Sequence, residues 1–177
     1  LFKKKNQHII ETAKKFIRDT IKVDVKENPT INLRSDSIAQ EKKNYSISND
    51  ETNIVLGTGG SGETKRVPSK IFLEVMKNTL KKGKCKFFIA TGNAKEEIEI
   101  LDQILKSDLK EFCIPLNNLN ISKIIPIIKN CDVSICNDSS FSHLSAALNI
   151  PTIVLMADTP LVYGSYSSLM HPILPEG

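Results

Sequence analysis

Residues 131 to 143 read CDVSICNDSSFSH, and this stretch indicates both the fold and the place of a ligand site. The residues from Val133 to Cys136, which include one serine, have the length of a short buried strand. It stops at a polar turn that opens directly into a helix of small residues ending near Leu148. A helix N-terminus presents unpaired N–H groups and partial positive charge, which favour a phosphate, and a serine there can cap the helix. The side chains expected around this anion site are Asp138, Ser139, Ser140 and His143.

The segments on either side repeat the same alternation of strand and helix. Runs such as Phe87-Phe88-Ile89 are continuously apolar, as in strands that are buried on both faces. The pattern therefore predicts an α/β fold in three layers (α/β/α), with a parallel sheet of about five or more strands. Pro126 implies that its helix begins late, near Ser122, or is kinked. The expected strands are 53–56, 86–90, 111–114, 133–136 and 152–156, and the expected helices are 68–81, 95–106, 121–130 and 141–148.

The chain divides near residue 52. Residues 6 to 19 have one apolar face and predict a helix. Residues 22 to 52 are polar, with little periodicity, and indicate a linker or an extended arm. We therefore expect a connector helix and polar linker over 1–52, followed by one ligand-binding domain over 53–177.

Composition narrows the function classes. The net charge of +4 comes from 21 Lys and three Arg, with no aromatic residues interleaved. This argues against nucleic acid as a partner and favours a solvated basic face, near an anionic membrane surface or a phosphorylated ligand. The four cysteines form no C-x-x-C pair, so we expect no structural metal and a reducing, cytoplasmic compartment. Without an 18-residue apolar run or a secretory leader, the protein is expected to be soluble.

The first polar loop, residues 57 to 68, reads GTGGSGETKRVP and satisfies G-x-G-x-x-G. The expected helix begins only at Pro68, however, and no acidic residue stands at the end of the next strand, as a dinucleotide site requires. The phosphate-loop pattern also fails, because Glu63 stands where lysine is required. What remains is a flexible backbone with hydroxyls and cations that can meet negative charge. The alternative is a long surface turn with solvated cations.

The second polar loop, residues 91 to 97, places two carboxylates, Glu96 and Glu97, in the first turn of a helix. The helix dipole alone explains acidic residues there. A carboxylate at this edge of the sheet can equally accept hydrogen bonds from ligand hydroxyls. His143, taken alone, is also compatible with an ordinary half-buried histidine.

The stretch 131–155 resembles the C-terminal half of glycosyltransferase family 9, the ADP-heptose:lipopolysaccharide heptosyltransferases. The residues 59–68 are similar to the family's early Gly-x-x-x-x-x-Lys-x-Trp-Pro loop, with Lys65 on the lysine and Val67 in place of the tryptophan. Ser140 stands where the family has glycine. The residues that match the later motif are Asp138, Ser139, His143, Leu144, Ala146, Ala147, Leu148, Pro151 and Thr152.

This resemblance implies a Rossmann-like domain of a two-domain, B-fold glycosyltransferase that holds the nucleotide-sugar donor. It implies an inverting transfer from a nucleoside-diphosphate sugar, expected to be ADP-linked, to a lipopolysaccharide or other cell-surface glycan, with no metal and no cofactor. Lys65 would meet the diphosphate or sugar, and Glu96 or Glu97 the nucleotide hydroxyls. The full set of expected donor-binding residues is Thr58, Gly59, Ser61, Lys65, Glu96, Glu97, Asp138, Ser139, Ser140 and His143.

The resemblance also implies what this chain lacks. The family's catalytic base lies in an N-terminal acceptor domain, so we expect a donor-binding fragment that cannot transfer sugar alone. Its place would be the cytoplasm or, by peripheral association, the cytoplasmic face of the inner membrane. Two alternatives stay open: a non-catalytic nucleotide-binding or scaffold domain, and a dinucleotide-binding module of an oxidoreductase.

Overall fold

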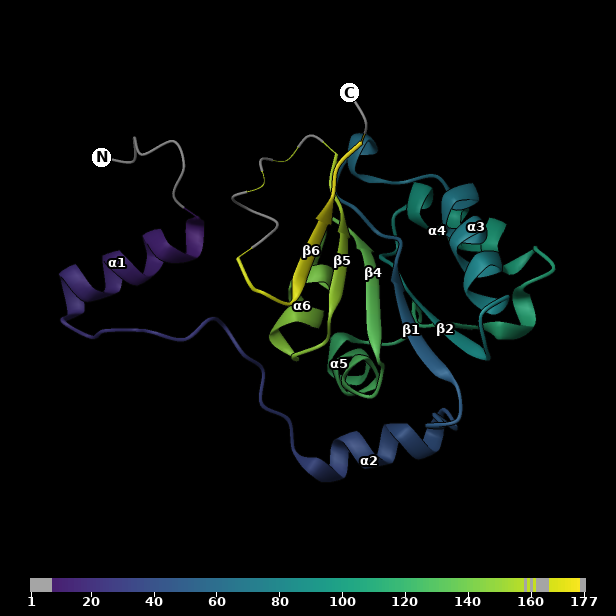
Figure 1. Ribbon diagram of the computed structural model, residues 1–177, viewed down its shortest axis with the longest axis horizontal. Coiled ribbons are helices and arrows are strands. Elements are labelled where there is room, and N and C mark those ends of the chain that lie inside the picture. The colour runs from purple at the N-terminus through teal and green to yellow at the C-terminus, as the bar shows by residue number, and fades with distance from the viewer. Residues whose placement is uncertain (1–7, 158, 160, 162–165, 176–177) are drawn as a thin grey trace.

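Six parallel strands form one sheet in the order β3-β2-β1-β4-β5-β6 (Figure 1). The computed structural model describes residues 8–157, 159, 161 and 166–175. The strands are β1 (Thr52–Gly57), β2 (Cys85–Ala90), β3 (Cys113–Pro115), β4 (Val133–Asn137), β5 (Thr152–Leu155) and β6 (Met170–Ile173). β1 pairs with β2 on one side and β4 on the other, so that Gly57 lies between Ala90 and Cys136. The predicted parallel sheet is confirmed.

Helices cover both faces of this sheet. α3 (Ser69–Leu80) and α4 (Lys95–Leu105) lie on one face, where Phe72 and Leu101 pack with Phe87 (Figure 1). α5 (Ile121–Lys129) and α6 (Ser140–Ala147) lie on the other, where Ile127 packs with Phe88. Because successive strand residues point to opposite faces, both Phe87 and Phe88 are fully buried. This two-sided burial is the reason that the strands lack polar alternation.

The helix that contains Pro126 begins within one residue of its predicted start near Ser122. α5 begins at Ile121, where the side chain of Asn120 accepts a hydrogen bond from the backbone N–H of Lys123 at 3.2 Å and caps the helix. The proline removes only the bond to the carbonyl of Ser122, an exposed residue. Its own ring is buried.

The polar segment 22–52 contains a helix that was not predicted from the sequence. α2 (Ser35–Asn44) packs against α5, and its buried Glu41 pairs with Lys123 at 3.3 Å. Ile31 and Ile47 contact the same core as Phe88. The expectation of a plain linker is therefore wrong for this part of the segment. The domain boundary at residue 53 stays a prediction, but residues 31–47 are packed onto the domain that follows.

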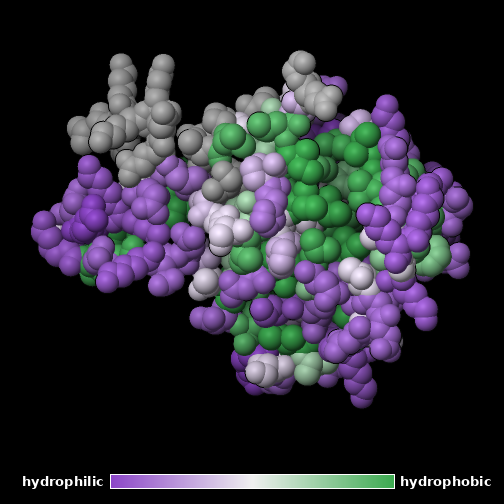
Figure 2. Space-filling view, in the orientation of Figure 1, coloured by the Kyte–Doolittle hydropathy of each residue, from purple (hydrophilic) through white to green (hydrophobic). Residues whose placement is uncertain are grey.

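α1 (Ile9–Ile21) lies apart from the sheet, at the end of an extended segment (Figure 1). It matches the predicted helix, of which residues 6 and 7 lie outside the described part of the chain. None of its residues is buried, and Ile9 and Phe16 are 53% and 62% exposed. In Figure 2 hydrophilic side chains cover most of α1, whereas hydrophobic residues gather over the centre of the molecule. α1 therefore contributes little to the core.

Candidate functional site

The predicted site residues gather at the carboxyl ends of β1 and β4, the middle strands of the sheet. The chain runs from β1 through α3 to β2 on one side, and from β4 through α6 to β5 on the other. Connections that leave neighbouring strands in opposite directions open a crevice where ligands bind in α/β sheets. The loop 58–68 and the turn 137–140 meet at this crevice.

A salt bridge joins these two segments. Lys65, at the end of a short 3-10 helix (Glu63–Lys65), places its Nζ 3.1 Å from Oδ2 of Asp138. The Asp138 side chain is only 6% exposed, whereas that of Lys65 is 28% exposed. Burial would raise the pKa of Asp138, but hydrogen bonds from Thr159 and Lys65 outweigh it, and the pKa is lowered. The result is a buried carboxylate that holds a partly exposed cation at the crevice.

Asn137, which was not predicted as a site residue, fixes the first loop to β4. Its side-chain amide donates to the carbonyl oxygens of Thr58 at 2.9 Å and Gly59 at 3.4 Å. Its own oxygen accepts from the backbone N–H of Val67 at 3.4 Å. Asn137 is completely buried. The only signal in the sequence is a polar residue at the end of an apolar strand, next to Asp138.

Of the two candidate carboxylates, Glu97 faces the first loop and Glu96 is exposed. Glu97 accepts hydrogen bonds from the backbone N–H of Gly60 at 2.9 Å and of Ala94 at 3.2 Å. A side chain on Gly59 would come within 2.8 Å of the Glu97 carboxylate, and one on Gly92 would come closer still. The two glycines are therefore needed for close approach at this point.

The remaining polar side chains of the first loop differ in what they contact: one bonds to the loop backbone, one is exposed and one is buried. Arg66 donates to the carbonyl of Gly60 at 3.0 Å, whereas Ser61 is exposed. The hydroxyls of Thr58 and Thr91 are buried, with no hydrogen-bond partner among the described residues. Thr91, which follows β2, was not predicted as a site residue. Buried hydroxyls without a protein partner are places where an ordered water is expected.

The N-terminus of α6 differs in detail from the prediction. Ser139 occupies the cap position, but its side chain makes no capping bond, and its buried hydroxyl is unpartnered among the described residues. Ser142 instead donates both its backbone N–H and its hydroxyl to the Ser139 carbonyl, at 3.2 and 2.7 Å. Ser140 is the first residue of the helix and is exposed. The prediction that Ser139 or Ser140 caps the helix with its side chain is thus wrong, although the helix begins within one residue of the expected position.

His143 lies one turn into α6 and is half-buried. Its Nδ1 lies 3.2 Å from the hydroxyl of Tyr166, and the two rings stack with their centroids 5.5 Å apart. Burial lowers the pKa of His143; Asp138 acts against this shift and Lys65 adds to it. The imidazole is therefore neutral at pH 7. Tyr166 was not predicted as a site residue, since nothing local connects it with a residue 23 positions earlier.

The fold and this crevice define a doubly wound α/β domain with a lysine, a buried carboxylate and a helix N-terminus at one edge of its sheet. A family model described as glycosyltransferase family 9 (heptosyltransferase) matches residues 1–169. The chain therefore belongs to glycosyltransferase family 9. The resemblance to this family predicted from the sequence is confirmed.

Individual proteins are similar to this chain in sequence or in fold. The chain is 32% identical over 106 residues to lipooligosaccharide heptosyltransferase 2 of Haemophilus influenzae. These aligned residues make up 58% of the chain and 30% of that protein. A family 9 glycosyltransferase from Veillonella parvula has the same fold, with a TM-score of 0.80 and 16% identity over 98% of the chain and 51% of the solved one. The E. coli heptosyltransferase WaaC with ADP gives a TM-score of 0.72 and 17% identity, covering 98% of the chain and 52% of that one. The chain thus spans about half or less of these proteins.

In the part of the chain that the structure describes, no helix has both the length and the apolar content needed to cross a bilayer.

Proposed function

We propose that this chain is the donor-binding half of a sugar transferase that uses a nucleoside-diphosphate sugar, with a lipopolysaccharide or related glycan as acceptor. The observation that carries the proposal is the pair of Lys65 and Asp138 beside the N-terminus of α6. The buried carboxylate orients the ammonium group toward the crevice, where it meets an anion. The E. coli heptosyltransferase WaaC, solved with ADP, and the family's description as heptosyltransferase support an ADP-linked heptose as the donor.

The chemistry of such a transfer requires stabilisation of a leaving group. An acceptor hydroxyl attacks the anomeric carbon, the bond from that carbon to the diphosphate oxygen breaks, and the diphosphate leaves with the electron pair. Charge therefore develops on the diphosphate, where donors already in position act best. Lys65 and the first N–H groups of α6 are such donors, and on this proposal they act without a metal or a further cofactor.

The other roles follow from the positions of the remaining groups. The partly exposed carboxylate of Glu97 is proposed to face the nucleoside or sugar hydroxyls. The base that takes the proton of the acceptor hydroxyl is assigned to the acceptor-binding half of the transferase, not to this chain. The four cysteines are free, which supports a reducing, cytoplasmic location.

Calorimetry and thermal melting with ADP, UDP, GDP and NAD test this proposal. We expect a nucleoside diphosphate to bind, and ADP most tightly, with stabilisation of about 2.7 kcal/mol at a hundred times the dissociation constant. Binding of NAD alone would overturn the transferase proposal and favour an oxidoreductase module. Binding of none of the four would favour a scaffold domain, an alternative that Ser140 in place of the family's glycine supports.

A further inference from the structure

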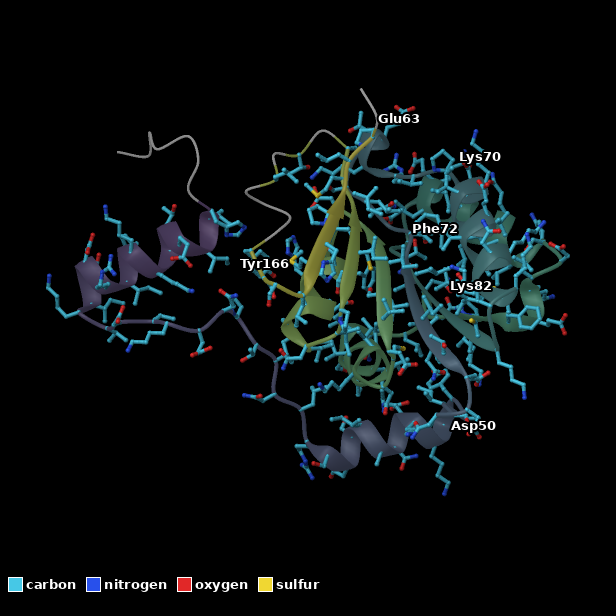
Figure 3. The ribbon with its side chains drawn as sticks, in the orientation of Figure 1. Asp50, Glu63, Lys70, Phe72, Lys82 and Tyr166 are labelled. Atoms are coloured by element: carbon cyan, nitrogen blue, oxygen red, sulfur yellow. The ribbon has the colours of Figure 1, made fainter. Side chains whose placement is uncertain are left out.

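Tyr166 lies between two histidines from distant parts of the chain. Its ring is stacked on that of His143, at an interplanar angle of 11°, and lies 5.0 Å from that of His8 at an angle of 52°. His8 is the N-cap residue of α1, and His143 lies in α6 at the proposed diphosphate site. Figure 3 shows Tyr166 between the near end of α1 and the start of β6. The tyrosine thus connects the connector helix with the site.

Several contacts hold Tyr166 in place. Its backbone carbonyl accepts a hydrogen bond from the side chain of Asn28 at 3.1 Å. Its ring packs against a small core of Val154, Met156 and Met170 around β5 and β6. Because backbone and ring are both anchored, the phenol hydroxyl has a defined position, 3.2 Å from Nδ1 of His143.

The protonation states of the two rings decide the direction of this hydrogen bond. Burial raises the pKa of Tyr166, so that the phenol keeps its proton, and burial also lowers the pKa of His143, so that the imidazole is neutral at pH 7. A neutral imidazole has one acceptor nitrogen and one N–H. The imidazole nitrogen is a better acceptor than a phenol oxygen, whose lone pair is delocalised into the ring. The favoured arrangement has the hydroxyl as donor and Nδ1 as acceptor.

We propose that Tyr166 is a positioning residue for His143: by donating to Nδ1 it places the imidazole proton on Nε2, and by stacking it fixes the plane of the ring. His143 then offers an N–H, and not a lone pair, to the diphosphate of the donor. This second step rests on the proposed function, whereas the tautomer does not. The charged and titratable groups that act on His143 are Asp138, Lys65, Tyr166 and His8.

The experiment compares the 177-residue chain with Tyr166→Phe, which keeps the ring and removes only the hydroxyl. Nitrogen-15 NMR of the imidazoles reads the tautomer directly, with the His143 signals assigned by loss in His143→Gln. In the unaltered chain at pH 7 we expect Nδ1 unprotonated and Nε2 protonated. In Tyr166→Phe we expect a mixture of the two tautomers, and an affinity for ADP about fivefold weaker. Tyr45→Phe, which alters another partly buried tyrosine that packs in a different hydrophobic cluster, should change neither.

The outcomes separate the two proposals. An unchanged tautomer in Tyr166→Phe, or a proton on Nδ1 in the unaltered chain, overturns the positioning role even if ADP binds. A tautomer that shifts as expected in a chain that binds no nucleoside diphosphate supports the positioning role and overturns the proposed function. A melting temperature of Tyr166→Phe close to that of the unaltered chain shows that the comparison is between folded proteins.

Discussion

The side-chain amide of Asn137 donates to the carbonyl of Thr58 at 2.9 Å and thereby ties the end of β4 to the end of β1. Replacing Asn137 by Ala leaves this carbonyl and the N–H of Val67 without their partner in a buried place. We expect a loss of about 1–3 kcal/mol in the free energy of unfolding, measured by urea denaturation. Asn118→Ala, at an exposed position, is the matched control and should cost less than about 0.5 kcal/mol. Equal losses of stability in the two variants would show that the hydrogen bonds of Asn137 to the first loop do not stabilise the fold.

Lys65→Met should weaken nucleoside-diphosphate binding by about ten- to a hundredfold, because it removes the one side-chain cation that is bonded to Asp138 among the described residues. The free energy of unfolding should also fall, since the buried carboxylate of Asp138 loses the positive charge that offsets the cost of its burial. Isothermal titration calorimetry and urea denaturation measure the two effects. Lys70→Met, at an exposed position in the first turn of α3 (Figure 3), removes the same charge from a residue that is not paired with Asp138. If Lys70→Met weakens binding as much, the effect is one of net charge only.

The lowered pKa of Asp138 predicts a dependence of stability on pH. Below the pKa of the unfolded chain, ordinarily 3.8, the unfolded state takes up the proton before the folded state does. The contribution of Asp138 is thus fully present above that pH and is lost as the pH falls through the folded-state pKa. The unfolding free energies of the unaltered chain and Asp138→Asn, measured between about pH 7 and about pH 2.5, should therefore converge in acid. A constant difference would contradict the shift.

His143 should act in a separate and higher pH window. Its pKa is lowered mainly by burial, so the unfolded chain binds the proton more readily, and stability falls as the pH drops below the ordinary value of 6.5. His143→Gln should flatten the stability curve between about pH 7 and about pH 5. His8, whose pKa burial also lowers, contributes in the same direction, so His8→Gln is measured in parallel. If neither variant alters the curve, the two imidazoles are not held neutral by the fold.

Gly92→Ala tests the close approach between the second loop and Glu97. The added methyl would displace the carboxylate from the N–H of Gly60, and we expect a cost of about 1–3 kcal/mol in stability together with weaker ADP binding. Gly83→Ala is the control, because a side chain there meets no atom within 4 Å. It should be neutral or slightly stabilising through a reduced entropy of the unfolded chain. A larger loss of stability in Gly83→Ala than in Gly92→Ala would show that the Glu97 side chain moves aside at no cost in free energy.

The sequence predicts those strands and helices whose buried residues are mostly apolar. β1, β2, β4 and β5 are apolar runs, and each was located to within one or two residues. α2 was missed because the residue that it buries most deeply is Glu41, which interrupts the hydrophobic periodicity. β6 was missed because it is a short edge strand with Pro172, a residue that argues against a strand within a sheet.

The site follows the same rule. The glycines, Lys65 and Asp138 stand in loops where a pattern can be recognised, and the structure brings them together. Tyr166 and Asn137 act through contacts between distant segments, which no local pattern records. The choice between Glu96 and Glu97 also required the structure, because only the rotation of α4 about its axis decides which of two adjacent carboxylates turns toward the loop.

Lys65 and Asp138 are separated by 73 residues, and this distance has a consequence for the order of folding. A chain that has assembled only its first three strands already holds the lysine, but the carboxylate arrives with the fourth. Contacts of long sequence separation form late, because loop closure must precede them. We therefore expect the proposed anion site to be completed late in folding, and a ligand that needs both groups would bind only chains in which β1 and β4 have paired.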